Sequence, residues 1–390
     1  MNIGIDKIGF YTPHLYVETK ELAVARNIDP GKFTVGIGQE KMSVPPITQD
    51  AVSLAANAAH EILTEEDKQQ IDFVIFATES GIDHSKAGAV YVHELLGINS
   101  NARSIEVKEA CYGATAGIQI AKGHIALNPD SKVLILGSDI ARYGLNTGGE
   151  VTQGAGAVAI VMSTDPSIMT LESPSTYQTE DIMDFWRPIF SDKAFVDGKQ
   201  SVDKYLSFFQ DIWKVHKQKT ELELKDFEAI CFHLPYTKMG QKALKAVIPE
   251  GTEADQERLL ANFETSKQYN KIVGNIYTGS LYLSLLSLLE LNTNIEAGAR
   301  IGLFSYGSGA VGEFFSGILQ PNYKDALHTA QHETLLAERK EISVAEYEEV
   351  FEDIVPAGEP TIELPVENDP APICFSGVKD HMRQYVRKDG

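Results

Sequence analysis

The sequence predicts an α/β protein made of two similar halves, and three observations support this class. Short apolar runs alternate with helical patterns along the first 165 residues. The same alternation returns after residue 220. The chain has 390 residues, whereas one domain typically has about 100–200. We therefore expect an N-terminal half over residues 1–165 and a C-terminal half over residues 166–390.

The expected strands of the first half are short, unbroken and apolar, as strands buried on both faces are. They are residues 73–78 (FVIFAT), 132–137 (KVLILG) and 155–162 (AGAVAIVM). Residues 51–63 and 114–127 carry small and aliphatic side chains at helical spacing. Strands and helices in this alternating order are typical of an α/β domain.

The second half repeats the first in its pattern of strands. Residues 227–232 (FEAICF) resemble the run at 73–78, and residues 300–305 and 309–315 resemble the last two strands of the first half. This similarity predicts a duplicated unit. In paired sheets of this kind, binding sites form where the carboxyl ends of strands converge between the halves.

Two segments of the second half fall outside this pattern. Residues 173–201 are aromatic and polar and include Pro174 and Pro188, which predicts covering loops extending over about 173–220. Residues from about 330 to 390 form an acidic C-terminal region containing EYEEVFED. We interpret that region as solvated surface with one amphipathic helix.

The composition excludes several classes of function. Lysine and arginine number 34 and aspartate and glutamate 55, for a net charge of −21. This balance argues against binding nucleic acid or an anionic membrane. The three cysteines lie far apart with no CxxC pair, so we expect neither a disulfide framework nor a metal site. We see no secretory signal and no apolar stretch of about 20 residues, and we expect a cytoplasmic protein.

Cys111 is the candidate nucleophile. A strand-like run ends at Val107, and small residues after Cys111 open a helix. A thiol at a helix N-terminus is near the positive end of the dipole, which we expect to lower its pKa. The alternative is a small buried cysteine without chemistry, and Cys231, within an apolar strand, fits that alternative better.

Two titratable residues directly follow buried strands, one in each half. His233 follows FEAICF and could serve as a base or as a hydrogen-bond donor. Glu79 follows FVIFAT, where burial would raise its pKa towards the range a general acid or base needs. The alternatives are a residue without a role in catalysis for His233, and a solvated or helix-capping acid for Glu79.

Weaker signals lie in two turns of the second half. Asn275 in GNIYTGS opens a helix and could orient a carbonyl or merely cap that helix. Ser308 lies in the glycine turn YGSG between two late strands. No GxxxxGKS, HExxH or GxGxxG motif stands where nucleotide hydrolysis, zinc proteolysis or Rossmann hydride transfer would need it.

Taken together, these motifs resemble hydroxymethylglutaryl-CoA synthase in its short bacterial form, within the thiolase-like condensing enzymes. The matching segments follow the family's order along most of the chain: DPGKFTVGIGQEKM from Asp29, TESGIDHSK around Glu79, ACYG around Cys111, DGKQS ending at Ser201, FHLPYTK around His233, GNIYT around Asn275 and YGSG around Ser308. The resemblance implies a thiolase-like fold of α-β-α-β-α layers with a mixed five-stranded sheet in each half.

The resemblance also implies a reaction. Acetyl-CoA, acetoacetyl-CoA and water would give 3-hydroxy-3-methylglutaryl-CoA and CoA in the mevalonate pathway. Cys111 would carry the acetyl group, Glu79 would take a proton from its methyl, and His233 would polarise the acetoacetyl carbonyl. CoA thioesters are then substrates, no cofactor is expected, and the family leads us to expect a homodimer.

Further residues are expected to bind substrate. By motif position they are Asp29, Thr152, Ser201, Lys242, Asn275 and Ser308. Tyr143 and Asp184 are added as further candidates. Lys238, Lys242 and Lys245 have i, i+4 and i+7 spacing, which places them on one helix face. This stripe could receive the phosphates of CoA, or it could consist of ordinary solvated lysines.

Four other readings stay open. A 3-oxoacyl carrier-protein synthase would use Cys111, His233 and Asn275 but would leave Glu79 without a role. A thiolase would want a second cysteine where Ser308 stands. A non-catalytic acyl-CoA-binding protein would not need the cysteine, and a cysteine hydrolase would not need the duplicated sheet. Ala114 stands where the longer eukaryotic form has glycine, which affects substrate fit rather than class.

Overall fold

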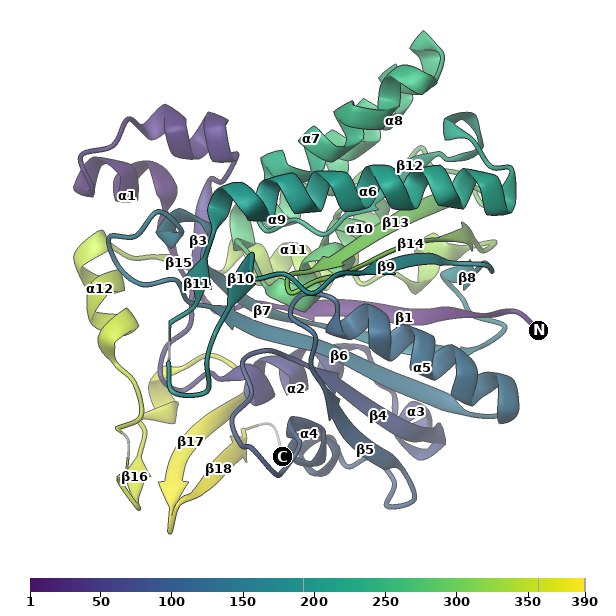
Figure 1. Cartoon of the computed structure of the whole chain (residues 1–390). Coiled ribbons are helices and arrows are strands. Elements are labelled where there is room, and N and C mark those ends of the chain that lie inside the picture. The colour runs from purple at the N-terminus through teal and green to yellow at the C-terminus, as the bar shows by residue number, and fades with distance from the viewer. Residues whose placement is uncertain (192, 357, 389–390) are drawn as a thin grey trace.

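The computed structural model describes residues 1–191, 193–356 and 358–388 (Figure 1). Five strands of the first half lie in the order β1-β7-β6-β4-β5. Their bounds are β1 Ile3–Tyr11, β4 Ile71–Ala77, β5 Arg103–Val107, β6 Lys132–Ala141 and β7 Gly154–Thr164. β5, β4 and β6 are parallel, while β7 runs antiparallel to both β6 and β1. The predicted apolar strands of this half are therefore confirmed.

The second half contributes five more strands to the same sheet. They are β8 Met169–Leu171, β9 Thr176–Thr179, β12 Ala229–Phe232, β13 Arg300–Gly307 and β14 Val311–Leu319. β8 pairs with β14 through one edge and with β1 through the other. The mixed five-stranded sheet expected in each half is confirmed, and the structure adds that β8 joins the two into one ten-stranded mixed sheet. A strand has two hydrogen-bonding edges, and sequence pattern does not show which of them is occupied.

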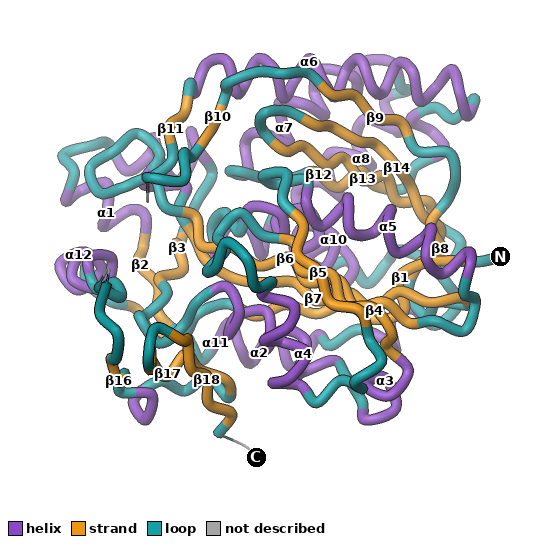
Figure 2. The backbone as a smooth tube through the Cα atoms, turned by 60° about the horizontal axis from the view of Figure 1, so that its bottom comes forward, coloured by secondary structure: helices purple, strands orange, loops and turns teal. Residues whose placement is uncertain are grey.

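Helices form three layers around the two half-sheets (Figure 2). α5 Gly113–Leu127 and α10 Ser280–Leu291 lie between the half-sheets, and their apolar residues share one core with strands of both halves. α2 Ala51–Ile62, α4 Gly88–Leu96 and α11 Thr329–Ala337 cover the first half-sheet. α6 Gly198–Thr220, α7 Thr237–Val247 and α8 Glu253–Ser266 cover the second. The predicted five-layer order is confirmed, while the division at residue 165 stays a prediction.

The remaining elements are short. They are α1 Thr19–Ala25, α3 Glu65–Gln70, α9 Gln268–Val273, α12 Val344–Glu352, β2 Leu15–Glu18, β3 Lys41–Val44, β10 Phe185–Trp186, β11 Phe195–Val196, β15 Lys340–Glu341, β16 Ile362–Glu363, β17 Ile373–Lys379, β18 Met382–Arg387 and the π-helical turn η1 Lys32–Ile37. Within the described residues, no helix is both long enough and apolar enough to cross a bilayer.

Two expectations about irregular segments need correction. Covering loops were expected over about 173–220, but the last part of that segment is α6, whose buried side chains include Tyr205, Phe209 and Trp213 at helical spacing. The acidic region after residue 330 holds two helices, α11 and α12, and a buried strand, β17. His332 of α11 is buried against β1, where it accepts a hydrogen bond from the Phe10 amide at 3.2 Å. The acidic composition of the region after residue 330 had indicated solvated surface and gave no sign of this packing.

Candidate active site

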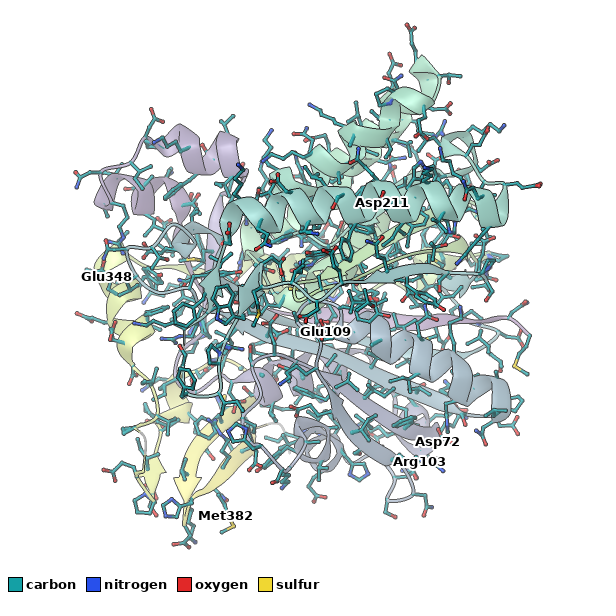
Figure 3. All side chains as sticks on the ribbon, in the orientation of Figure 1. Asp72, Arg103, Glu109, Asp211, Glu348 and Met382 are labelled. Carbon is teal, nitrogen blue, oxygen red and sulfur yellow. The ribbon has the colours of Figure 1, made fainter. Side chains whose placement is uncertain are left out.

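Cys111 stands in a tight turn between β5 and α5. Glu109 and Cys111 form an isolated bridge, and the intervening Ala110 has a left-handed φ of 40°. This turn packs closely against Gly307 of the other half. Glycine allows the contact, because a Cβ added at Gly307 would lie 2.6 Å from the Glu109 carbonyl oxygen. Figure 3 labels Glu109 near the centre of the molecule. Cys111 itself stays partly accessible.

Glu79 faces this cysteine from the loop after β4. The Cys111 thiol donates a hydrogen bond to Glu79 Oε1 across 3.7 Å. Burial, and next the charge of Asp139, raise the pKa of the Glu79 carboxyl to about 8. The sequence predicted this direction and this cause. A carboxyl with such a pKa can both accept and release a proton near neutral pH.

The pKa of the Cys111 thiol was expected to be lowered by the helix dipole, and this expectation was wrong. Burial raises it well above its usual value, and the charges of Glu79 and Asp139 raise it further. The dipole amounts to about half an elementary charge. Desolvation and two nearby carboxyls outweigh it, so the thiol needs a base to take its proton when it attacks.

Asp139 of β6 was missed by sequence reasoning. It is fully buried, and its Oδ1 accepts hydrogen bonds from the Glu79 amide at 2.9 Å and the Ser80 hydroxyl at 2.8 Å. Its Oδ2 accepts from the Thr278 amide at 3.3 Å. Burial raises its pKa to about 6. The signal was available, since Asp139 follows the apolar run 132–137 much as Glu79 follows 73–78.

The second half brings His233 to the same edge of the sheet. The His233 amide donates to the Phe304 carbonyl at 2.8 Å, so His233 extends β12 beside β13, whose end packs on the Cys111 turn. Its Nδ1 is buried without a hydrogen bond among the described residues. Burial lowers the pKa of His233 to about 3, which makes the imidazole neutral at physiological pH.

Asn275 and Tyr143 also meet near this centre. The Asn275 side-chain oxygen accepts from the Tyr277 amide and the Ser280 hydroxyl, both at 2.9 Å. Its amide nitrogen donates to the Tyr143 hydroxyl at 3.4 Å. The Tyr143 ring lies 6.0 Å from the ring of Phe185, which sequence reasoning also missed. Cys111 and Glu79 both raise the pKa of Tyr143, after burial, so the tyrosine is close to both.

Asp184 anchors the covering segment. It is fully buried and accepts from the Tyr306 hydroxyl and the Gly309 amide, both at 2.9 Å. These contacts fix β10 against the turn that carries half-buried Ser308. Arg187 of the same segment donates to the Glu79 carbonyl oxygen, and no sequence signal had pointed to Arg187.

The other predicted binding residues lie outside this cluster. Asp29 is exposed and accepts from the Gly31 amide at 2.6 Å. Thr152 donates to the Gly149 carbonyl at 2.8 Å, and the Ser201 amide donates to the Asp197 carbonyl at 2.9 Å, so each of these contacts stays within a local turn. No described contact joins these three residues to Cys111.

The segment that begins at Asp29 nevertheless meets the lysine stripe. The Thr237 hydroxyl donates to the Gly38 carbonyl at 2.6 Å, and the Lys238 side chain packs against Gly38. Lys242 and Lys245 are exposed on α7. A cavity of about 560 Å³ lies elsewhere, between α2 and α11, and none of the predicted site residues lines it.

Comparisons with known proteins agree with this arrangement. The family model described as Hydroxymethylglutaryl-coenzyme A synthase N terminal matches residues 1–167, and its C-terminal counterpart matches residues 172–267 and 252–356. A hydroxymethylglutaryl-CoA synthase of Enterococcus faecalis is 53% identical, over 99% of this chain and 100% of that protein. A polyketide biosynthesis 3-hydroxy-3-methylglutaryl-ACP synthase of Bacillus subtilis (strain 168) is 32% identical, over 90% of this chain and 88% of that protein.

Solved structures are similar along the whole chain. HMG-CoA synthase complexed with CoA has a TM-score of 0.96 and 46% identity, covering 99% of this chain and 100% of the other. MvaS in complex with 3-hydroxy-3-methylglutaryl coenzyme A has a TM-score of 0.91 and 34% identity, covering 99% of both chains.

Proposed function

This chain belongs to the hydroxymethylglutaryl-CoA synthase family, and we propose that it condenses acetyl-CoA with acetoacetyl-CoA and water to 3-hydroxy-3-methylglutaryl-CoA and CoA. The observation that carries the proposal is the half-buried pair of Cys111 and Glu79, in contact across 3.7 Å. A thiol beside a carboxyl of raised pKa suits a reaction that needs both a nucleophile and a base.

In the first step, Cys111 sulfur attacks the carbonyl carbon of acetyl-CoA and its proton passes to Glu79. The bond to the CoA sulfur breaks, and CoA leaves as the thiol with the proton that Glu79 returns, so that Glu79 is ionised again. Because the pKa of the thiol is raised, a base must take this proton as the sulfur attacks, and Glu79 is the carboxyl that already accepts from the thiol. The product is acetyl-Cys111, which holds one substrate in place for the second.

In the second step, ionised Glu79 removes a proton from the acetyl methyl, and the resulting carbanion attacks the ketone carbon of acetoacetyl-CoA. His233 is neutral and donates a hydrogen bond to the ketone oxygen as negative charge develops there. The resulting alkoxide takes the proton that Glu79 removed from the methyl group, which gives the 3-hydroxy group. Asn275 and Ser308 position acyl carbonyls. Water then hydrolyses the bond to Cys111 and releases the product.

For the CoA portion, we place the phosphates near Lys238 and Lys242, where α7 meets the segment that begins at Asp29. Tyr143 and Asp184 shape the acyl site, one beside Asn275 and one behind Ser308. Thr152 and Ser201 are assigned to substrate binding from motif position alone. CoA thioesters are substrates, and the proposal needs no cofactor.

The proposal extends to cellular context. We place the reaction in the mevalonate pathway of the cytoplasm, and the enzyme as a homodimer. Support for the dimer comes from β5, which ends the strand order and carries partly exposed Ile105. An uncovered edge strand offers unpaired backbone groups to another strand. A molar mass near 43 kDa in light scattering would contradict the dimer.

The reaction is tested by incubation with acetyl-CoA alone, followed by mass spectrometry of peptides. We expect one acetyl group at Cys111, none in Cys111→Ala, and normal labelling in Cys374→Ala, a control that removes a buried cysteine elsewhere. CoA release should then depend on added acetoacetyl-CoA. Labelling at Cys231, or no labelling, would refute the mechanism.

The family also contains a relative named for an acyl-carrier-protein substrate. The same experiment separates the two substrate classes if the acetyl donor is supplied either on CoA or on an acyl carrier protein. We expect CoA to be the better donor, since the E. faecalis relative is much more similar.

A further inference from the structure

A buried carboxylate on β14 binds the helix that begins just after the nucleophile. Glu313 is 1% exposed. Its Oε2 accepts from the Tyr112 hydroxyl at 2.6 Å, and its Oε1 accepts from the Gln119 side-chain amide at 2.8 Å. Tyr112 is the N-cap residue of α5 and Gln119 lies two turns further on, so both belong to one face of that helix.

Burying a carboxylate at this position costs free energy, and two accepted hydrogen bonds, one on each oxygen, would offset that cost. Burial disfavours its charge and raises the pKa of Glu313. A glutamine would fit the same space with less desolvation, but an amide has only one acceptor oxygen. The carboxylate can hold two donors at once, one on each oxygen. The structure shows both oxygens used in this way.

The same helix face has a second attachment to the other half. Ser305 of β13 is paired with Glu313 across the sheet, and the Thr115 hydroxyl of α5 donates to the Ser305 hydroxyl at 2.9 Å. Residues 112, 115 and 119 of α5 are therefore all held by adjacent positions on β13 and β14. These contacts cross between the half that carries Cys111 and the half that carries His233.

The connection from Glu313 to the nucleophile is short. Tyr112 follows Cys111 directly, and a Cβ added at Gly307 would lie 2.7 Å from the Tyr112 Cβ. The turn therefore has little freedom on that side. A change in the direction of the Tyr112 side chain would rotate the backbone that carries the sulfur.

We propose that Glu313 is a positioning residue, which holds Tyr112 and Gln119 so that Cys111 keeps its place relative to the residues of the second half. The proposal rests on the proposed function, because it concerns the rate at which Cys111 takes up an acetyl group. Glu313 contacts no reacting atom; it acts through Tyr112.

The test measures single-turnover acetylation of Cys111 by acetyl-CoA, together with KM and thermal unfolding. Glu313→Gln keeps the shape but removes one acceptor. We expect acetylation to slow by about 10–100-fold with KM changed less than about 3-fold, because misplacing a nucleophile costs rate rather than affinity. Tyr112→Phe removes one donor of the pair and should slow the same step.

The double variant Glu313→Gln/Tyr112→Phe provides the decisive comparison. If the two residues act as one unit, it should be no slower than the slower single variant. Multiplied effects would overturn the proposal, and so would a folded Glu313→Gln that acetylates at the wild-type rate. If Glu313→Gln fails to fold, Tyr112→Phe and Gln119→Leu test the same contacts, and wild-type acetylation in both would overturn it.

Glu172→Gln is the matched control. Glu172 also lies between the halves and pairs with Arg300 at 2.8 Å, but it does not contact the first turn of α5. We expect a lower unfolding temperature with acetylation within about 2-fold of wild type. An equal loss of acetylation in this variant would show that general loosening suffices and would refute a specific role for Glu313. Wild-type protein that takes up no acetyl group would instead refute the proposed function.

Discussion

Glu79 lies where burial disfavours its ionised form, and the raised pKa that results would suit its proposed role as a base. Its environment combines burial with the nearby charges of Asp139 and Glu109, opposed by Arg187 and by the hydrogen bond from Cys111. An ordinary glutamate would be ionised at pH 7 but would be too weak a base to take a methyl proton. The raised pKa makes Glu79 a stronger proton acceptor once it is ionised.

The first prediction concerns the pH dependence of condensation. Because the base must be ionised and its pKa is about 8, kcat/KM should rise with pH up to about 8 and then level. Glu79→Gln should lower condensation by about 10³-fold or more and remove this rise. Acetylation should fall less, because a thiol is a stronger acid than a methyl group and can release its proton to water. A wild-type profile that is flat between pH 6 and 9 would contradict this role.

The same residue should cost stability at high pH. The pKa of Glu79 is raised from 4.5 to about 8, so the folded protein binds this proton more tightly than the unfolded chain does. The free energy of unfolding therefore falls as pH rises from about 4.5 to 8. Thermal unfolding should show Glu79→Gln equal to wild type at pH 5 and about 2–4 °C more stable at pH 8. The reverse order at pH 8 would contradict the burial of an ionised Glu79.

At the scale of elements, Asn275 depends on two backbones in close contact. A Cβ added at Gly154, the first residue of β7, would lie 2.7 Å from the backbone nitrogen of Asn275 and 2.8 Å from its backbone carbonyl oxygen. Gly274 has a left-handed φ of 93°, and a Cβ there would lie 2.2 Å from the Gln153 carbonyl oxygen. Both positions accept only glycine without movement of the loop.

We therefore predict that Gly154→Ala displaces the Asn275 loop. It should lower the free energy of unfolding by about 2–4 kcal/mol and reduce condensation in whatever fraction folds. Gly123→Ala is the matched control, because a Cβ at this exposed position in α5 meets nothing within 4 Å. That variant should be more stable by about 0.5–1 kcal/mol with unchanged activity. Urea unfolding and the CoA-release assay measure both, and equal effects of the two substitutions would contradict this account.

Sequence patterns predicted some strands correctly but missed a short strand and a long helix. The apolar runs 73–78 and 132–137 predicted β4 and β6, because parallel strands that are buried on both faces are apolar throughout. The joining of the half-sheets by β8 was not predictable, because three residues carry too little pattern. α6 was missed because its apolar stripe is narrow and its mean character is polar.

The candidate site was predictable where residues follow strands. Glu79 and His233 were found in this way, and the same argument applied to β6 would have added Asp139. Arg187 lies in a loop, and Glu313 stands within a strand; their importance comes from contacts made across the fold. The thiol pKa was predicted in the wrong direction because the helix dipole is visible in sequence, whereas burial and approaching carboxyls are not.

At the scale of the whole molecule, an acidic protein is proposed to bind a polyanionic substrate. The net charge is −21, so the average field repels CoA, while Lys238 and Lys242 supply positive charge on one face of α7. Salt screens charges over about 8 Å at 0.15 M ionic strength, and it weakens both effects. The sign of the salt dependence therefore tells whether local attraction or overall repulsion dominates.

We predict that local attraction dominates, because the phosphates would lie close to the lysines, whereas the net negative charge is spread over the whole molecule. KM for acetyl-CoA should rise about 3-fold or more between 50 and 500 mM NaCl, with little change in kcat. Lys242→Gln should raise KM at low salt and flatten this dependence. Lys225→Gln is the control, since exposed Lys225 pairs with Glu223 at 2.7 Å outside the proposed CoA site, and its slope should match wild type. A KM that falls as salt is added would mean that overall repulsion governs binding, and the phosphates would then have to be placed away from α7.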